Sequence, residues 1–368
     1  MKIVHVLTYS YDNGGVSKVV FDLAKSQMQD GNNVTIISID LPGHKTYHKI
    51  SGVEIIHFQS SFLARFFPLF SVELFRFFSK KDQDVYHLHG FWNFTLLASY
   101  ILGLASKTLV SVHGCANPYT FNGNFLKRTL FSFAFQKAFL KNAKAIHVFH
   151  ENEKQYVIDY LKKNPKNIFI VPNGIDFKDE VSLKNFRFNS RKVLFMSRLD
   201  PIKGLDLLLP AFLEVNKVVP EAKLLLAGPD FGMLDFVKEF ITKNNAENAI
   251  EYLGVATGET KQKLMDEANI FVLPSYSEGF SIAVLEALKL GIPVVVSQFT
   301  GLSADILEYN AGIVVNHNVG EITSGILEIL RNPEKAKLYA KNGQALVKER
   351  FEEKLVQKKM AQLYSIFI

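Results

Sequence analysis

The sequence predicts an α/β protein with two domains, each built on a parallel sheet. Short β-branched apolar runs alternate with longer amphipathic stretches from end to end, as in repeated βα units. The chain has 368 residues, and about 100 to 200 residues per domain give two domains. After a polar, charge-mixed stretch at 176–191 the alternation starts again. We expect a first domain over 1–178, a second over 179–350, and a helix over 351–368 that can cross back to the first.

The expected strands follow from the apolar runs, and helices fill most of the gaps between them. In the first domain the strands are 2–7, 33–39, 53–58, 84–88, 108–113, 145–149 and 168–171, and in the second they are 193–196, 223–227, 250–253, 270–273, 293–297 and 313–315. In the tail, Val356, Met360, Leu363 and Phe367 are spaced for one helical face. Since ligands of parallel sheets bind beyond the carboxyl ends of the strands, we expect two sheets that face a central cleft.

Composition excludes several classes of protein. The single cysteine, Cys115, permits neither an internal disulfide nor a multi-thiolate metal site, so a reducing cytoplasm is expected. No uncharged apolar stretch reaches the roughly 20 residues that a membrane-spanning helix needs, and the run Met1–Leu7 is too short for a signal peptide. The net charge of +6 favours an anionic ligand or surface.

The junction after the predicted strand 270–273 has the features of an anion site. Ser281 is a plausible N-cap of the next helix, and the backbone N–H groups of Gly279, Phe280 and Ser281 lie at its positive end. Glu278 precedes this turn and Glu286 follows it on the helix. Taken alone, these two glutamates are explained about equally well as ligand-binding residues and as solvent-exposed residues of a loop and a helix.

A second junction supplies cations. The predicted strand 193–196 runs into a loop that carries Arg198 and Lys203. An arginine can bind phosphate oxygens in a fork while a lysine adds a point charge, so the pair could neutralise a diphosphate without a metal. An ordinary solvated loop can contain an arginine or a lysine. It explains poorly why both occur in the same domain as the junction with Glu278 and Glu286.

Two further junctions lie in the first domain. Gly14 and Gly15 open a helix after the first strand and could let the backbone approach a ligand. A dinucleotide fingerprint is absent, although Asp40 lies where a ribose-binding acid is expected.

His87, His89 and His113 cluster at predicted strand ends. One of them could bind a sugar hydroxyl or polarise a reacting group, the alternative being a half-buried structural histidine. Zinc is possible but disfavoured, because no H-E-x-x-H or Cys/His spacing occurs.

These motifs together resemble glycosyltransferase family 4, the retaining nucleotide-sugar enzymes of the two-Rossmann-domain GT-B fold. The resemblance covers essentially the whole chain and rests on four motifs: the pair Glu278 and Glu286, the segment with Arg198 and Lys203, Pro172–Asp176, and Gly14-Gly15. A weaker similarity, over residues 89–94 and 111–118, is to enzymes of bacterial capsule, exopolysaccharide and O-antigen (lipopolysaccharide) synthesis.

The resemblance implies a role for each matching residue. It implies that Arg198 and Lys203 bind the donor diphosphate, that Glu286 holds ribose hydroxyls, that Glu278 contacts the transferred sugar, and that His113 positions that sugar. Catalytic roles are thus expected for His113, Glu278, Arg198 and Lys203. Gly15, Gly279, Phe280 and Ser281 complete the expected donor site, and Gly14, His89 and Asn173 are the acceptor-side candidates.

The expected reaction moves a hexose-type sugar from a UDP- or GDP-linked donor to a saccharide or lipid-linked saccharide. Neither a metal nor a further cofactor is expected. Two Phe-rich basic segments, 62–81 and 125–144, could lie on an anionic leaflet or fill the core. The alternatives are a nucleotide-sugar 2-epimerase and a basic module that binds a membrane surface or nucleic acid. The acidic residues spread among the cations disfavour nucleic acid.

Overall fold

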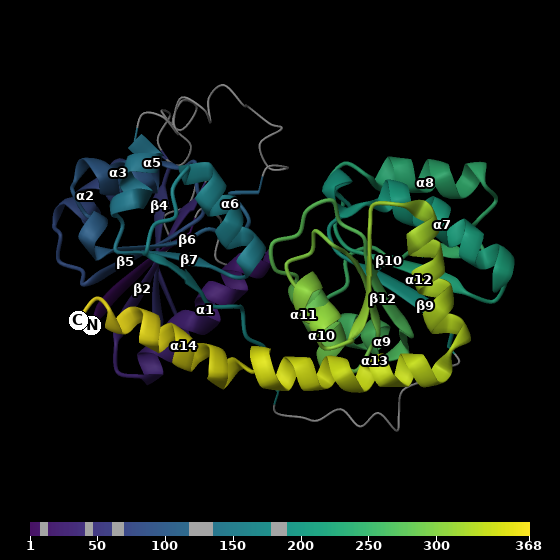
Figure 1. Ribbon diagram of the computed structural model, residues 1–368. Coiled ribbons are helices and arrows are strands. Elements are labelled where there is room, and N and C mark those ends of the chain that lie inside the picture. The colour runs from purple at the N-terminus through teal and green to yellow at the C-terminus, as the bar shows by residue number, and fades with distance from the viewer. Residues whose placement is uncertain (8–13, 41–46, 61–69, 118–134, 178–189) are drawn as a thin grey trace. The chain divides into compact units, whose positions relative to one another are not determined.

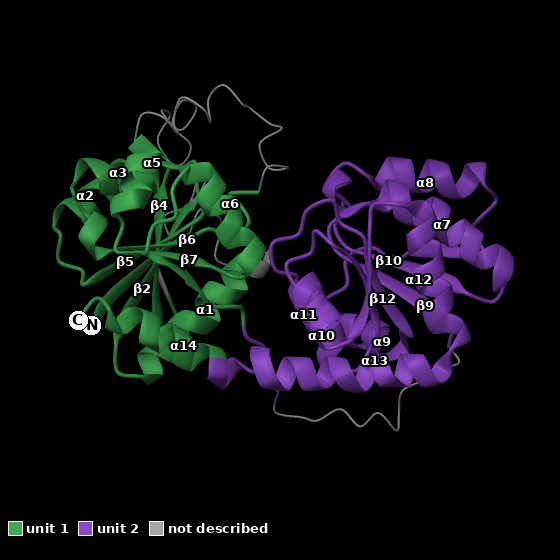
Figure 2. Cartoon of the chain, in the orientation of Figure 1, with its two compact units in different colours: residues 1–173, 356–368 green, residues 174–355 purple. Residues whose placement is uncertain are grey.

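A computed structural model describes residues 1–7, 14–40, 47–60, 70–117, 135–177 and 190–368. Two compact units divide the chain (Figure 2): unit 1 comprises residues 1–173 and 356–368, and unit 2 comprises residues 174–355. The division thus falls a few residues before the expected boundary at 178. Each unit is a parallel sheet, apart from one edge strand in unit 1, with helices on both faces (Figure 1), so the predicted α/β class is confirmed.

Unit 1 is built on eight strands in the order β3-β4-β2-β1-β5-β6-β7-β8. All neighbours pair in parallel except β3, which pairs with β4 in the antiparallel sense. Its elements are β1 Lys2–Leu7, α1 Gly14–Gln29, β2 Asn33–Asp40, β3 Tyr47–Ile50, β4 Val53–Gln59, α2 Val72–Ser79, β5 Val85–His89, α3 Phe94–Ile101, the 3₁₀ turn Ala105–Lys107, β6 Thr108–Ser111, α5 Lys137–Asn142, β7 Ala145–Val148, α6 Glu151–Leu161, β8 Ile168–Ile170 and α14 Glu353–Ser365.

Unit 2 is built on six parallel strands in the order β11-β10-β9-β12-β13-β14. Its elements are β9 Lys192–Met196, the 3₁₀ turn Pro201–Lys203, α7 Leu205–Val218, β10 Lys223–Ala227, α8 Leu234–Lys243, β11 Ile250–Tyr252, α9 Gly258–Glu267, β12 Ile270–Leu273, α10 Ile282–Lys289, β13 Val294–Ser297, α11 Ser303–Glu308, β14 Gly312–Val315, α12 Val319–Arg331, α13 Pro333–Leu346 and the π turn Val347–Phe351.

The last helix, α14, packs on the sheet of unit 1. Val356, Met360, Leu363 and Tyr364 are buried in a core with β1, β2 and α1, so α1 and α14 cover the same face of that sheet (Figure 1). The opposite face has its own core, to which α2, α3, α5 and α6 contribute. Among the described residues, no helix is long and apolar enough to cross a membrane.

Two expectations about the strands of unit 1 were wrong. The strand expected at 108–113 ends at Ser111, and His113 lies beyond it with a φ of 52°, in the left-handed region that no regular strand contains. Strand β3 was not expected at all. It is a four-residue edge strand with the sequence YHKI, which has no apolar run that marks it as a strand.

Candidate functional site

The two chemistry-bearing junctions of unit 2 leave neighbouring strands. The strand order reverses between β9 and β12, and these two strands pair in parallel. The loop after β9 carries Arg198 and Lys203, and the loop after β12 carries Glu278 and Ser281. Because ligands of open α/β sheets bind where the strand order reverses, this edge of the sheet is the expected ligand site of unit 2.

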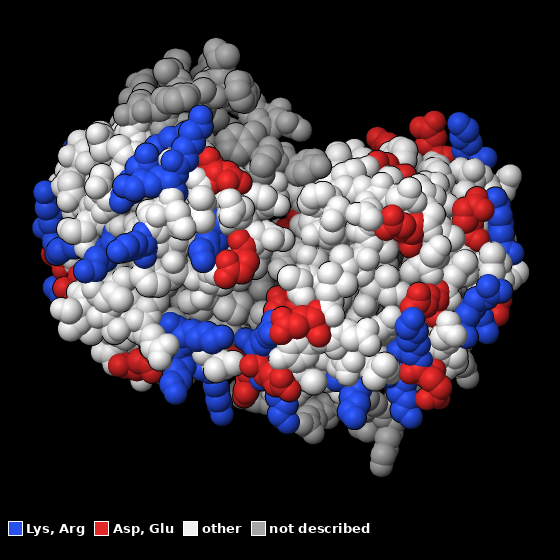
Figure 3. Space-filling model, in the orientation of Figure 1, with Lys and Arg blue, Asp and Glu red and all other residues white. Residues whose placement is uncertain are grey.

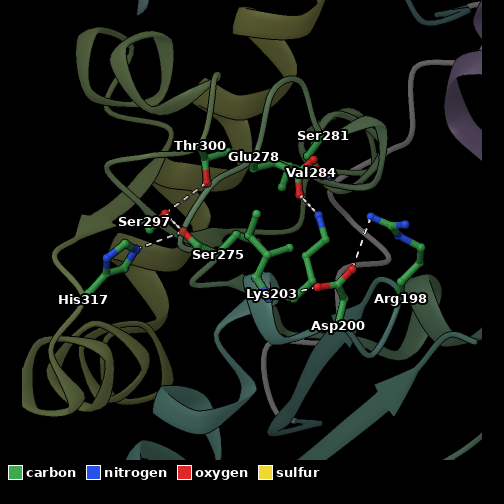
Figure 4. Close-up of polar contacts among 11 residues, drawn as sticks. Arg198, Asp200, Lys203, Ser275, Glu278, Ser281, Val284, Ser297, Thr300 and His317 are labelled. Atoms are coloured by element: carbon green, nitrogen blue, oxygen red, sulfur yellow. Dashed lines mark hydrogen bonds and ion pairs between the residues drawn. The ribbon is translucent and has the colours of Figure 1, made fainter. Parts of the chain in front are cut away.

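Lys203 and Glu278 form an ion pair at this edge (Figure 4). Their side chains are 9% and 15% exposed, so the pair is largely removed from water. Taking both charges out of water costs free energy that mutual attraction offsets only when the geometry is good. The two groups, 75 residues apart in the sequence, are therefore held together by the surrounding loops.

The loop that carries Lys203 is fixed by a short capped turn. The carboxylate of Asp200 accepts a hydrogen bond from the backbone N–H of Ile202 at 3.0 Å, and the N–H of Lys203 donates to the carbonyl of Asp200 at 2.8 Å. Gly204 follows with a φ of 72°. A Cβ at Gly204 would lie 2.3 Å from the carbonyl oxygen of Pro274, so glycine permits the two loops to approach.

Backbone hydrogen bonds from the neighbouring loop hold Glu278 in place. The N–H of Glu278 donates to the carbonyl of Phe299 at 3.1 Å, and the N–H of Gly301 donates to the carbonyl of Glu278 at 2.9 Å. Earlier in the same loop, the carbonyl of Ser275 accepts from the hydroxyl of Ser297 at 2.5 Å. The Glu278 carboxylate is thus presented by a rigid loop.

The turn into α10 has the capped form that the sequence predicts. Ser281 has extended backbone angles, and its hydroxyl accepts from the N–H of Val284 at 3.4 Å. The turn before it contains Gly279 and Phe280, and the Phe280 ring packs edge-on against Phe351 at 5.6 Å between centroids. The Phe280 ring thus anchors the turn, whose backbone amides are the groups that the sequence predicts for an anion.

Glu286 pairs with a lysine that no sequence motif indicates. On α10, its carboxylate accepts from the Nζ atom of Lys261 on α9 at 2.7 Å. Arg198 is the more open cation, with a half-exposed side chain 3.6 Å from Asp200 and its guanidinium 4.7 Å from the centre of the Phe231 ring. Unit 2 therefore places Arg198, Lys203 and Glu278 beside the capped turn (Figure 4), and α10 also carries the pair of Glu286 with Lys261. Such groups suit an anionic ligand that carries hydroxyl groups.

The candidate residues of unit 1 lie in its own strand-to-helix junctions. Gly14 and Gly15 are the first two residues of α1, and the loop before them falls outside the described residues. His113 is half-buried, and burial lowers its pKa to about 3. Asn173 is the last residue of the first segment of unit 1 and is buried. Unit 1 and unit 2 each hold their own part of the candidate set.

His89, expected on the acceptor side, is 3% exposed. Its Nε2 atom bonds to Nδ1 of His5 at 3.1 Å, and its Nδ1 atom bonds to Nε2 of His113 at 2.9 Å. Both ring nitrogens are therefore engaged inside the protein. Direct contact between His89 and an acceptor is not supported by this geometry, because a ligand would have to displace one of these histidines.

Glu153 is a further residue that sequence motifs did not indicate. From α6 its carboxylate accepts hydrogen bonds from the N–H groups of Gly114 and, at 2.8 Å, Phe149. Burial raises its pKa to about 7 against the effect of these bonds. Glu153 thereby fixes the backbone next to His113. Lys261 and Glu153 meet their partners only through the fold, so no local signal marks them.

Three buried histidines could supply metal ligands by proximity alone. The ring nitrogens of His5, His87 and His89 lie within 4.8 Å of one another. However, both nitrogens of each ring already bond to protein groups. A metal would have to replace several of these bonds.

Comparison with known proteins identifies both halves of the chain. The family described as Glycosyl transferases group 1 matches residues 177–346, and Glycosyltransferase Family 4 matches residues 13–179. A GDP-mannose:cellobiosyl-diphosphopolyprenol alpha-mannosyltransferase of Xanthomonas oryzae pv. oryzae is 24% identical over 345 residues, which is 90% of this chain and 87% of that protein.

Solved structures show the same fold over the whole chain. A sucrose-phosphate synthase from Thermosynechococcus elongatus has a TM-score of 0.83 at 22% identity and covers 99% of this chain and 98% of its own. Anabaena Alr3699/HepE in complex with UDP and glucose has a TM-score of 0.76 at 19% identity and covers 99% of both chains. The two units are thus those of the GT-B fold, and this chain belongs to glycosyltransferase family 4.

Proposed function

We propose that this protein is a retaining glycosyltransferase that moves a hexose-type sugar from a nucleoside diphosphate sugar to a saccharide or lipid-linked saccharide. The observation that carries this proposal is the ion pair of Lys203 and Glu278 beside the capped turn at Ser281. A diphosphate can share the Lys203 ammonium with Glu278 while the turn donates its amides. The Xanthomonas relative is named for GDP-mannose and the Anabaena structure contains UDP, which supports a UDP- or GDP-linked donor.

The chemistry follows from where charge develops. When the bond from the anomeric carbon to the diphosphate breaks, negative charge appears on the leaving group, and Arg198, Lys203 and the amide turn stabilise it there. The anomeric centre becomes positive, and the Glu278 carboxylate stabilises it through space. Fixed cations thus do the work that a metal ion does in other phosphate sites, and we propose a metal-independent reaction.

The stereochemical course is part of the proposal. The acceptor hydroxyl attacks the face of the sugar from which the diphosphate leaves, a new bond from oxygen to the anomeric carbon forms, and the hydroxyl proton passes to an oxygen of the departing diphosphate. This route conserves the anomeric configuration and needs no covalent intermediate on the enzyme. The resemblance to retaining members of the family supports it.

Glu286 has the position to bind the ribose hydroxyls of the donor. Its carboxylate is held on α10 by Lys261 and lies after the amide turn in the chain. A carboxylate accepts two hydroxyl hydrogen bonds from neighbouring oxygens of a ribose. Lys261 keeps that carboxylate oriented when no donor is bound.

A basic surface on unit 1 supports the proposal that the protein associates peripherally with the cytoplasmic face of a membrane. Desolvation, and then repulsion from Lys162 and Lys141, lowers the pKa of Lys137. This repulsion arises because the three lysines lie close together near α5. Figure 3 shows Lys and Arg side chains together in this region. An anionic leaflet attracts such a cluster by about 1 kcal/mol per cation. The expected Phe-rich segments are described only in part: Phe78 of α2 and Phe139 of α5 fill the core, and residues 61–69 and 118–134 lie outside the described residues.

The role in surface-polysaccharide synthesis rests on similarity in sequence. The Xanthomonas relative, by its name, extends a saccharide carried on a polyprenol diphosphate, an acceptor of the class proposed here. A basic surface beside a membrane suits such a lipid-linked acceptor. We therefore propose a role in the assembly of capsule, exopolysaccharide or O-antigen.

The experiment is a donor panel on the full chain. We expect UDP- or GDP-sugars to raise the melting temperature of the protein without added metal. Without an acceptor, we expect water to attack the donor slowly in its place, so that free nucleotide is released. Lys203→Met should abolish the shift, whereas Lys192→Met, which removes another unit 2 ion pair, with Glu267 at 2.6 Å, should leave it intact. A donor epimerised at C2 without an acceptor would favour the epimerase instead, and inversion at the anomeric carbon would contradict retention.

A further inference from the structure

One continuous set of polar side chains crosses the face of the unit 1 sheet that α1 and α14 cover. His5 on β1, His87 and His89 on β5, Ser111 on β6 and His147 on β7 are all buried. Side chains on a strand alternate between faces, and these strands are neighbours in register, with His5 opposite His87, His89 opposite Ser111 and Ser111 opposite His147. The five side chains therefore share one face.

The direction of the hydrogen bonds is fixed at one end of this set. The Nε2 atom of His147 bonds to the carbonyl oxygen of Val171 at 2.7 Å, and a carbonyl only accepts, so Nε2 carries the proton. A neutral imidazole then has a lone pair on Nδ1, and the Ser111 hydroxyl donates to it at 2.6 Å. His87 must donate from Nε2 to Ser111, also at 2.6 Å, and accept at Nδ1 from the Tyr364 hydroxyl at 2.6 Å.

Gln27 on α1 sets the direction for the remaining histidines. Its Oε1 atom lies 2.8 Å from Nε2 of His5. An amide oxygen only accepts hydrogen bonds, so Nε2 of His5 is the donor.

The last two links reach His113. His5 donates from Nε2, so its Nδ1 atom accepts from Nε2 of His89 at 3.1 Å. His89 in turn accepts at Nδ1 from Nε2 of His113 at 2.9 Å. The rings are neutral throughout, because a charge in this buried group is costly and burial lowers the pKa of each histidine.

We propose that His89, with His5 and Gln27 behind it, is a positioning residue that keeps His113 neutral as the Nε2–H tautomer, so that the Nδ1 lone pair of His113 accepts a hydrogen bond from a sugar hydroxyl. The ligand at this position is then a hydroxyl donor and not a phosphate, which would need an N–H. In the part of the chain that the structure describes, no hydrogen bond to this Nδ1 atom is recorded. The role in sugar binding rests on the proposed function, whereas the tautomer does not.

The tautomer is tested by nitrogen NMR of protein labelled with ¹⁵N-histidine at pH 7.5, without ligand. We expect five histidines to be Nε2–H tautomers: His5, His87, His89, His113 and His147. In Gln27→Leu, His5, His89 and His113 should lose this preference, while His87 and His147, anchored at Val171, keep it as an internal control. An Nδ1–H tautomer at His113, or a Gln27→Leu spectrum unchanged at His113, would overturn the proposal, as would tight Zn²⁺ binding by the wild-type cluster.

Kinetics test the consequence for the sugar. His89→Leu should lower kcat/KM for transfer roughly 10- to 100-fold without changing the affinity for UDP or GDP, which unit 2 binds. His89→Gln should recover most of the loss, because its Oε1 accepts from His113 and its Nε2 donates to His5. His147→Gln, a matched change outside the path from Gln27 to His113, should stay near wild type. Equal activities of His89→Leu and His89→Gln would contradict the positioning role.

The two proposals fail in different ways. Absence of nucleotide-sugar binding would remove the proposed function and leave the NMR result to stand. An Nδ1–H tautomer in an enzyme that transfers sugar would remove this inference alone. If His89→Leu does not fold, as circular dichroism shows, Gln27→Leu replaces it in the kinetic test, because Gln27 lies two hydrogen bonds further from His113.

Discussion

Lys203 and Glu278 pair with each other across the edge of the unit 2 sheet, so the cation assigned to the diphosphate already has an anionic partner before any donor binds. The pair keeps the ammonium oriented without a ligand, which reduces the ordering cost of binding. It also requires the donor to share or replace a carboxylate. The pair thus links the stability of unit 2 to the affinity for its ligand.

Substitutions in this pair separate stability from binding. Lys203→Met leaves the partly exposed Glu278 carboxylate without its cation, which should cost about 2 to 4 kcal/mol of the free energy of unfolding and abolish donor binding. The double variant Lys203→Met, Glu278→Gln removes both charges and should recover most of the stability but not the binding. Urea unfolding and calorimetric titration with UDP or GDP measure the two quantities. Donor affinity restored in the double variant would show that Lys203 is not a ligand.

Gly204 is predicted to be essential for the approach of the two loops. Alanine there places a Cβ 2.3 Å from the carbonyl oxygen of Pro274 at a φ of 72°, so the loops must separate. Gly232 is the matched control, because it has a φ of 96° but a Cβ added there would meet nothing within 4 Å. In both variants the left-handed backbone costs about 1 kcal/mol. Thermal unfolding should therefore show a much larger loss for Gly204→Ala, and equal losses would argue against the close packing.

The sequence predicted the fold better than the side-chain partners. Apolar runs located strands such as 223–227 and 270–273 to the residue, because a buried parallel strand must be apolar over its length. The polar edge strand β3 lacked that signal. Ser281 was predicted as an N-cap because capping depends on neighbours in the sequence. The pairing of Glu286 with Lys261, and of His113 with His89, depends on the strand order and on tautomers, which no local pattern encodes.

The buried histidines predict a loss of stability in acid. Burial lowers the pKa of His5 and His147 to about 4 and that of His113 to about 3, and it lowers the pKa values of His87 and His89 well below their ordinary range. In the unfolded chain each takes up a proton near pH 6.5. As the pH falls from 6.5 to 4, His5, His113 and His147 each lower the free energy of unfolding by about 1.4 kcal/mol per pH unit. His87 and His89 act in the same sense.

Glu153 acts in the opposite sense over part of this range. Its pKa rises from 4.5 to about 7, so the folded state binds its proton more tightly and gains stability as the pH falls from 7 to 4.5. One carboxyl cannot offset five histidines. The melting temperature should therefore fall steeply from pH 7 to 5, and less steeply in His147→Gln. A melting temperature constant over that range would contradict neutral burial of the cluster.

Chelation tests whether the cations replace a metal. The proposed mechanism places Arg198 and Lys203 where negative charge develops on the leaving diphosphate, so dialysis against EDTA should leave both donor binding and transfer unchanged. Arg198→Ala should instead lower kcat/KM by about 10- to 1,000-fold. Full loss of transfer on chelation, with recovery on addition of Mg²⁺ or Mn²⁺, would be inconsistent with the proposed mechanism.

The most direct measurement is a crystal structure of the full chain with a nucleoside diphosphate sugar. The account predicts a diphosphate in contact with Arg198, Lys203 and the amides of the turn before Ser281, with ribose hydroxyls on Glu286. A diphosphate bound at the glycines of α1, with the loops after β9 and β12 unoccupied, would contradict it.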